Sequence, residues 1–440
     1  VAQLTAVSFD AILRDVFLPL TSGACLVIPE AAMDLGADRV LPWLSREKVT
    51  VLHGVPTLLE SWLASAPEGM RAEHLRWVLF SGESLTFELA RKCRTGMGAR
   101  GVVNLYGPTE TTMTKCFYVV PDDCPEEGLV PAGEAMPQTQ ALVLREDGVR
   151  CGIGEAGEIA IRTPYRTRGY VNGDQDDKTR FRPNPYRNDR DDLLYYTGDL
   201  GRCRANGSLE FLGRKDSQLK VQGARVEPSE VEQCLSLHPS VAQSAVVGQR
   251  TKSGMSLVAY AVARPGAVVE LRELKRHLRE RLPEYMVPQS IVALESLPLT
   301  ASGKLDRKAL SSIRGSAKEA AMRPSPVLPR TPLEQVIAGI WCEVLDRSEI
   351  SVEDDFFDLG GHSLLATQLV SRIRSAFRCD LPLREFFENP SVAGLARSLT
   401  ADPEAFPRVV RTAEILLEIA HLSDDAAESL LAERAEGKPR

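Results

Sequence analysis

Residues 354–369, DDFFDLGGHSLLATQL, constrain the fold of this chain more than any other stretch. An acidic loop and two glycines come before Ser363, and an apolar-periodic run follows it. Apolar side chains recur every four residues along that run, at Leu365, Leu369, Ile373 and Phe377. One stripe of a helix is therefore apolar and can pack on a small bundle. Because glycines break regularity, Ser363 is predicted to begin this helix.

A simpler interpretation is that Ser363 serves only as an N-cap. A second interpretation, a nucleophile elbow, is excluded because Leu365 stands where that motif needs glycine. A phosphoryl group on Ser363 would lie among free N–H groups at the positive end of the helix dipole. The whole string resembles the phosphopantetheine attachment signature of carrier domains in nonribosomal peptide synthetases. The resemblance implies that a phosphopantetheinyl transferase loads Ser363 with an arm whose thiol holds cargo as a thioester.

Length and composition set broad limits. The 440 residues predict about three domains. A net charge of −7 without a basic stripe argues against nucleic acid as a partner. Nine cysteines without a C-x-x-C pair indicate a reduced, cytoplasmic chain, and no apolar run is long enough to span a membrane. Because the sequence opens in mid-pattern without Met, an N-terminal portion is expected to be missing.

Residues 1–120 alternate apolar runs with amphipathic stretches, which predicts an α/β layered domain. The expected strands are 24–29, 50–52 and Trp77–Phe80, and the expected helices are 14–20, 57–63 and 87–95. A β-rich part follows, with strands at 140–145, Gly157–Arg162 and 207–212. Residues 213–227 are interpreted as a polar connector, after which an S-x-x-E capping box at 229–232 opens a compact α+β module. A proline-bearing linker then leads to the helical bundle.

Four polar strings suit a nucleotide site: 104–112 (NLYGPTETT), 196–200 (YTGDL), Phe211 to Arg214 (FLGR) and 301–307 (ASGKLDR). Hydroxyls and backbone N–H groups hold phosphate oxygens, Glu110 can ligate Mg²⁺, and Tyr106 offers a ring face to a base. Asp199 can accept two hydroxyl protons from a ribose. A single such string would usually be only a turn. The four in this order resemble the adenylation domains of nonribosomal peptide synthetases, which belong to the adenylate-forming superfamily with acyl-CoA ligases and luciferases.

The resemblance implies a multidomain fold. The expected parts are a partial α/β large subdomain (1–215), an α+β small C-terminal subdomain (216–312), a linker (313–330), an all-α four-helix carrier domain (331–400) and a helical tail (401–440). It also implies roles for single residues. Tyr106 and Phe211 would pack around adenine, Thr109 would contact phosphate, Glu110 the Mg²⁺, Asp199 and Arg214 the ribose, Asp216 would be the hinge, and Lys304 would be catalytic.

Lys304 does not belong to a Walker loop, because Leu305 follows it instead of Ser or Thr. A positioned ammonium there would stabilise charge that develops on the α-phosphate. The family's Ser/Thr/Gly-rich phosphate loop, which lies upstream of the segment matching residues 8–11, has no counterpart here. We therefore expect this piece to be inactive in adenylation by itself.

The implied reaction joins an amino acid to ATP as an aminoacyl-adenylate, and the arm thiol on Ser363 then takes the acyl group. Flanking condensation, ketosynthase or thioesterase domains are the implied protein partners. A free-standing acyl-CoA or aryl-acid ligase is disfavoured by Asp10, which in the family pairs with the substrate's α-ammonium, and by the fused carrier. The second alternative is a carrier and interaction fragment without adenylation activity.

By the same resemblance, nine residues would line the amino-acid pocket: Asp10, Ala11, Arg14, His53, Leu79, Ser81, Leu105, Met113 and Thr114. Bulky leucines with a small polar pair predict serine or another small polar amino acid. The run His53, Leu79, Ser81, Leu105 resembles the pocket of serine-activating domains, from which Ala11, Arg14 and Thr114 depart. Arg14 would instead suit an acidic side chain, unless it snorkels out of the pocket. In the tail, Ile415, Ile419 and Leu422 are predicted to form one apolar stripe, for docking or as part of a solvated helix.

Overall fold

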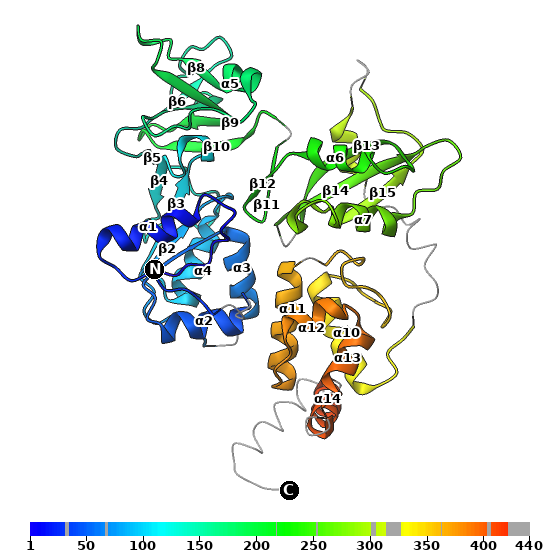
Figure 1. The fold of residues 1–440 in the computed structure, drawn as a ribbon. Coiled ribbons are helices and arrows are strands. Elements are labelled where there is room, and N and C mark those ends of the chain that lie inside the picture. Colours follow the sequence, from blue (N-terminus) through cyan, green and yellow to red (C-terminus); the bar gives the residue numbers. More distant parts are fainter. Residues whose placement is uncertain are drawn as a thin grey trace. The chain divides into compact units, whose positions relative to one another are not determined.

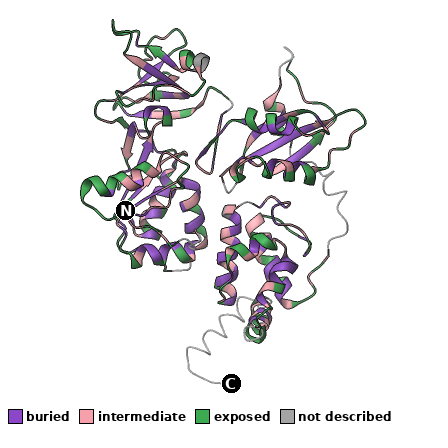
Figure 2. Ribbon diagram, viewed as in Figure 1, coloured by how far each residue is buried: buried purple, intermediate pink, exposed green. Residues whose placement is uncertain are grey.

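The computed structural model describes residues 1–30, 35–66, 69–216, 218–251, 254–300, 305–313, 327–361, 363–402 and 406–420. The chain divides into two compact units, one within residues 1–312 and the other mainly within 313–440 (Figure 1). No helix among the described residues is long and apolar enough to cross a membrane. Each unit has its own buried core (Figure 2).

The first sheet has five strands in the order β1-β2-β3-β4-β5. Their bounds are β1 Val51–Gly54, β2 Trp77–Phe80, β3 Gly101–Tyr106, β4 Cys116–Val119 and β5 Glu134–Ala135. β1, β2 and β3 run parallel, and β4 and β5 are antiparallel additions. The predicted strand at 24–29 is wrong, because Val27 makes only an isolated bridge with Ala2. An apolar run does not become a strand unless neighbouring backbone is available to pair with it.

Four helices accompany this sheet: α1 Ile12–Ser22, α2 Ala37–Arg46, α3 Pro56–Ser65 and α4 Phe87–Met97. α3 and α4 pack together and make the crossovers between the parallel strands. Local chemistry sets their ends. Pro56 opens α3, where a missing N–H costs nothing. The Thr86 hydroxyl caps α4 by accepting from the N–H of Leu89 at 3.1 Å. The predicted α/β alternation is confirmed.

The β-rich part forms a second sheet in the order β10-β9-β7-β6, with β8 beside β9. Its elements are β6 Gln140–Leu144, β7 Gly157–Arg162, α5 Asp174–Arg180, β8 Phe181–Pro183, β9 Leu193–Cys203 and β10 Leu209–Arg214. All of its pairings are antiparallel, and its inner face buries apolar side chains such as Ile159 and Ile161.

The interpretation of 213–227 as a polar connector is wrong in its second half, which forms a hairpin. β11 Leu219–Val221 pairs antiparallel with β12 Ala224–Val226. Gln222 and Gly223 both have positive φ (51° and 78°), as a tight two-residue hairpin turn requires. The sequence LKVQGARV does alternate apolar and polar residues. Because each strand has only three residues and contains a charged one, the stretch resembles a polar connector.

The small subdomain follows the hairpin. Its elements are α6 Pro228–Ser236, β13 Val241–Thr251, β14 Gly254–Ala263, α7 Leu271–Arg279, β15 Ser290–Leu294 and α8 Arg307–Ser312, with a short 3-10 turn at Glu284–Met286. The predicted capping box is wrong, because Glu227 is the N-cap and Pro228 opens α6. Glu232 instead accepts from the N–H of Val246 and from Arg307, at 2.8 and 2.9 Å, and so ties α6 to β13 and α8.

The second unit is a helical bundle of α10 Pro332–Leu345, α11 Ser363–Phe377, α12 Leu383–Glu388, α13 Val392–Leu399 and α14 Phe406–Ala420. The prediction that Ser363 begins a helix is confirmed. The predicted apolar stripe of α11 lies in the core, where Leu365, Leu369, Ile373 and Phe377 are all buried. Edge-to-face contacts among Trp341, Phe356 and Phe386 fill the centre of the bundle.

Helix α14 corrects the prediction for the tail. Val409 and Ala413 are fully buried in the bundle core, whereas Ile415 and Ile419 are 40% and 55% exposed. The helix therefore packs through a different face from the predicted stripe, and the docking role of that stripe stays a prediction. Leu422 and the rest of the tail lie outside the described residues.

Candidate functional site

A cavity of about 440 Å³ lies in the first unit. It opens at the carboxyl ends of the parallel strands β1, β2 and β3, the usual ligand position of such sheets. Eight of the nine predicted pocket residues line it: Asp10, Ala11, Arg14, His53, Ser81, Leu105, Met113 and Thr114. Leu79, the ninth predicted pocket residue, is not among its lining residues.

The predicted nucleotide residues line the same cavity. Tyr106, Thr109, Asp199, Phe211 and Arg214 are all on its wall. The Asp199 carboxylate accepts from the Tyr106 hydroxyl at 2.6 Å and from Arg214 Nη1 at 2.5 Å. Burial and the nearby Asp199 raise the pKa of Tyr106 well above its usual value, so its hydroxyl stays protonated and donates. The rings of Tyr106 and Phe211 lie 6.5 Å apart between centroids.

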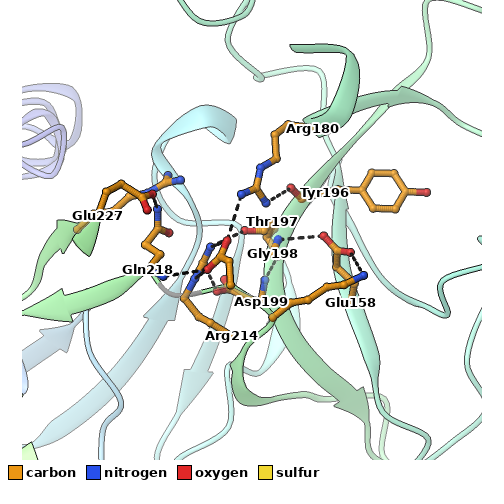
Figure 3. A network of polar contacts seen from close by, with 12 residues as sticks. Glu158, Arg180, Tyr196, Thr197, Gly198, Asp199, Arg214, Gln218 and Glu227 are labelled. Carbon is orange, nitrogen blue, oxygen red and sulfur yellow. Dashed lines mark hydrogen bonds and ion pairs between the residues drawn. The ribbon is translucent and has the colours of Figure 1, made fainter. Parts of the chain in front are cut away.

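Arg214 also binds the predicted hinge residue. Its Nε and Nη2 atoms each donate to the Asp216 carboxylate at 2.7 Å, and Arg180 adds a bond at 3.1 Å. Figure 3 shows the part of this network around Asp199, Arg214 and Arg180. Burial opposes ionisation of Asp216, but the Arg214 guanidinium prevails and lowers the pKa of the carboxyl. The segment before the hairpin is thus held by charged bonds to the large subdomain.

Glu110, the predicted Mg²⁺ ligand, lies in a short 3-10 turn, Thr109–Thr111, and is buried. Its Oε1 atom accepts from Arg225 Nη1 at 2.7 Å and from the Tyr170 hydroxyl at 2.6 Å. Its Oε2 atom is buried without a partner. One free carboxylate oxygen fits Mg²⁺, which is commonly held by one or two carboxylates together with substrate phosphates. Nowhere in the described ranges do three or more His, Cys, Asp or Glu residues gather as a metal cage.

The sequence reasoning missed the hairpin side of the site. Lys220, Gln222, Gly223 and Arg225 all line the cavity. The alternation of residues 219–226 was the available signal for the hairpin. No local signal placed it against Glu110, which lies 115 residues away in the chain. The close approach is possible because Gly223 and Gly82 meet backbone to backbone, where a Cβ on Gly82 would lie 3.3 Å from Gly223.

A second set of polar side chains lies at the cavity, around His53 and Ser81. His53 Nδ1 and Asp15 Oδ1 lie 2.5 Å apart, and both side chains are 1% exposed. Burial lowers the pKa of His53, and the bond to Asp15 opposes this shift only in part. Arg14 Nη2 donates to Ser81 Oγ at 3.2 Å. His53, Ser81 and Arg14 thus line the same cavity.

Of the two residues expected to carry the chemistry, Ser363 and Lys304, the structure describes only Ser363. Ser363 is the first residue of α11 and is half-buried, so its hydroxyl lies at a helix N-terminus within reach of solvent. Gly360 precedes it with φ 97°, a conformation that favours glycine. Lys304 lies outside the described residues.

Comparison with known families gives three matches along the chain. A family model described as AMP-binding enzyme matches residues 1–171, and one described as AMP-binding enzyme C-terminal domain matches residues 230–304. A third, described as phosphopantetheine attachment site, matches residues 335–399. The order of the matches is the order of the parts expected from the sequence.

Curated relatives are long synthetases. One of the subunits of linear gramicidin synthase from Brevibacillus parabrevis is 39% identical over 91% of this chain. A dimodular nonribosomal peptide synthase of Bacillus subtilis is 36% identical over 93% of it, and surfactin synthase subunit 3 of the same organism is 35% identical over 89%. The chain spans only 5%, 17% and 30% of the lengths of these three proteins, respectively.

Solved structures agree with these matches. Holo-PA1221, an NRPS protein with adenylation and PCP domains bound to a vinylsulfonamide inhibitor, is similar with a TM-score of 0.74 and 29% identity. The match covers 92% of this chain and 66% of that one. IdnL1 is similar with a TM-score of 0.61 and 30% identity, over 68% of this chain and 60% of its own. The likeness to holo-PA1221 extends over both compact units.

Proposed function

The chain consists of an adenylation domain with its small C-terminal subdomain and a phosphopantetheine carrier domain, and belongs to the nonribosomal peptide synthetases; from this premise we propose that it binds an α-amino acid as its adenylate and passes the acyl group to Ser363. The observation that carries the proposal is the single cavity on whose wall the nucleotide residues and the amino-acid residues meet.

Each wall residue has a task in this proposal. Asp10 accepts from the α-ammonium of the amino acid, and Tyr106 and Phe211 enclose the adenine. The Asp199 carboxylate, held by Arg214 and Tyr106, accepts from the ribose hydroxyls. Because its side chain is already fixed by two short bonds, little conformational freedom is lost when the ligand arrives.

Glu110 Oε2 would hold Mg²⁺, which supplies charge neutralisation at the phosphates. Lys304 is proposed to stabilise negative charge that develops on the α-phosphate oxygens. Asp216 is proposed as the hinge between the two half-reactions, because it joins β10 to the hairpin and its bonds to Arg214 and Arg180 can break as a set. The Thr109 hydroxyl is exposed and accessible to a phosphate oxygen.

The amino acid is proposed to have a short polar side chain, with serine the prediction made from the sequence. Leu105 and Met113 occupy the wall and limit the length of the guest. Ser81 and His53 supply polar groups at the same end. Since Leu79 is not on the wall, the limit on size rests on Leu105 and Met113.

The first test concerns the carrier. A phosphopantetheine arm on Ser363 supplies the thiol that accepts the acyl group. With a phosphopantetheinyl transferase and coenzyme A, intact-protein mass spectrometry should show one added arm on the wild-type chain. Ser363→Ala should abolish the gain, whereas Ser375→Ala, at an exposed serine of the same helix, should leave it intact. An arm added to the Ser363→Ala protein would refute the assignment.

The second test concerns the cavity and does not depend on turnover. Non-hydrolysable aminoacyl-adenylate analogues with a sulfamoyl linkage should bind the chain, as measured by isothermal titration calorimetry. Asp10→Asn should weaken binding at least about tenfold, because the α-ammonium loses an ionic partner. If no aminoacyl analogue binds, the chain is a carrier and interaction fragment and the proposed function is wrong.

A further inference from the structure

Arg14 has an unusual environment for an arginine. Its guanidinium lines the cavity, donates from Nη2 to the Ser81 hydroxyl at 3.2 Å, and keeps Nε buried without a partner. Within the described part of the chain, no carboxylate makes an ion pair with it. Burial lowers the pKa of Arg14, and the nearby Asp15 and Asp10 oppose that shift in part. The guanidinium is thus partly removed from water, and the hydrogen bond to the neutral Ser81 hydroxyl compensates for only part of that loss.

Several other partly buried arginines of this unit have a carboxylate partner, whereas Arg91 and Arg166 donate to backbone carbonyls instead. Arg214 binds Asp199 and Asp216, Arg225 binds Glu110, and Arg162 binds Asp192. Such pairing is expected, because a buried charge without a partner costs several kcal/mol. An arginine that faces a ligand cavity and lacks such a partner is suited to a ligand that supplies the carboxylate.

The backbone from Asp10 to Arg14 forms the start of α1 and places both residues at the cavity. Leu13 N–H donates to Asp10 O at 3.0 Å and Arg14 N–H to Ala11 O at 3.1 Å, so the chain is already turning helically at this point. Asp10 thus stands just before α1, and Arg14 lies in its first turn. Asp10 and Arg14 are four apart, and both line the cavity. A guest whose α-ammonium meets Asp10 therefore lies in the same cavity as the Arg14 side chain.

Building on the proposed function, we infer that Arg14, together with Ser81, selects an α-amino acid whose short side chain ends in a carboxylate, of the size of aspartate. A guanidinium binds a carboxylate through two parallel charge-assisted bonds, whereas a hydroxyl offers it one weaker neutral acceptor. Arg14 does not snorkel out of the cavity, because its bond to Ser81 holds it on the inner wall.

His53 is compatible with an acidic side chain in the cavity but does not select for one. Its Nε2 atom is buried without a partner, and its Nδ1 atom is held by Asp15. The neutral ring offers Nε2 as an acceptor to a hydroxyl or an amide, and the protonated ring offers a donor to a carboxylate. The imidazole adapts to the guest, whereas the guanidinium keeps its positive charge at any physiological pH. Arg14 therefore decides the class of side chain.

The test compares three aminoacyl-adenylate analogues with a sulfamoyl linkage: aspartyl, asparaginyl and seryl. Aspartate and asparagine have nearly the same shape, so the difference in their affinities reports the charge. By calorimetry on the full chain, the aspartyl analogue should bind at least about tenfold more tightly than the asparaginyl one. Arg14→Gln should abolish or reverse that ratio, and Arg14→Lys should keep part of it. Arg202→Gln, at a surface pair with Glu210, is the control and should change nothing.

The outcomes separate the inference from the function on which it rests. If the seryl or asparaginyl analogue binds most tightly to the wild type, the inference is wrong and the proposed function stands. If the aspartyl preference survives Arg14→Gln in a protein that still binds an analogue, Arg14 is not its cause. If none of the three analogues binds, the proposed function fails, and the inference fails with it.

Discussion

At the scale of single residues, three buried polar atoms without partners lie at or next to the cavity. Arg14 Nε, His53 Nε2 and Glu110 Oε2 are all buried and unpaired within the protein. Buried polar groups are normally hydrogen-bonded, and exceptions of this kind call for a ligand or an ion. All three belong to the walls or the immediate surroundings of one cavity, which is why the proposals above concentrate there.

His53 should make stability depend on pH. Because burial lowers its pKa, the folded chain binds a proton less readily than the unfolded chain, whose histidines titrate near about 6.5. The stability contributed by neutral His53 is therefore present above that pH and is lost as the pH falls through it toward the lower pKa of the folded state. We expect urea unfolding of the first unit to lose more free energy between about pH 7.5 and 5.5 in the wild type than in His53→Gln.

Glutamine is the matched replacement here, because its amide can still donate to Asp15 but does not titrate. His238, whose pKa is also lowered by burial, is present in both proteins and cancels from the comparison. Equal pH dependence of the two proteins would show that His53 does not titrate in this range.

At the scale of elements, the hairpin of β11 and β12 completes the cavity. The ion pair between Arg225 and Glu110 joins it to the large subdomain. Its turn can approach Val55 because Gly223 has no side chain, and a Cβ on residue 223 would clash with Val55 Cγ1. The carboxylate that is proposed to hold Mg²⁺ is thus the same one that holds the hairpin. In that proposal, Arg225 and a cation would bind the same carboxylate through its two different oxygens.

Removing the charge of Arg225 should loosen the hairpin. In Arg225→Gln, backbone amides of residues 219–226 should exchange hydrogen for deuterium several-fold faster. The effect is modest because Arg225 is 39% exposed, and such pairs contribute on the order of 1 kcal/mol. The control is Arg202→Gln, whose comparably exposed pair with Glu210 joins β9 to β10 instead. Unchanged exchange in the hairpin of Arg225→Gln would mean that other contacts hold it.

At the scale of the whole molecule, the two compact units have separate cores. Helix α14 lies beyond residue 399, where the match to the phosphopantetheine attachment family ends, yet Val409 and Ala413 belong to the core of the bundle. The domain boundaries drawn from the sequence, including one at 400, remain predictions. The packing of α14 makes it part of what stabilises the second unit.

Truncating Val409 should therefore destabilise one unit and leave the other unchanged. Val409→Ala removes two methyl groups from a fully buried site, which costs about 2 kcal/mol. For a unit of this size, the midpoint of its calorimetric transition should fall by roughly 10 °C. Ile415→Ala, on the exposed side of the same helix, should have little effect. A shift in both transitions would contradict the independence of the units, and a shift in neither would show that Val409 does not stabilise the second unit.

The sequence by itself determined the α/β alternation, the helix that begins at Ser363 and eight of the nine residues expected in the amino-acid pocket. These features are encoded locally: period-four and alternating patterns fix elements, and glycine, proline and hydroxyl residues fix their ends. Motif strings of four to nine residues carried the family resemblance, so Tyr106, Asp199 and Arg214 could be named without knowledge of any contact among them. The roles assigned to them, and to Lys304, remain predictions.

Only the tertiary structure decided which groups meet. The pairing of Glu110 with Arg225, the partners of Arg14 and the buried face of α14 all depend on segments that pack together from distant parts of the chain. Helix α14 has two interleaved apolar stripes, and the sequence does not say which one faces a core. Whether a charge is paired or left for a ligand depends on how much water the fold removes around it and which other groups the fold brings there. Local sequence specifies neither.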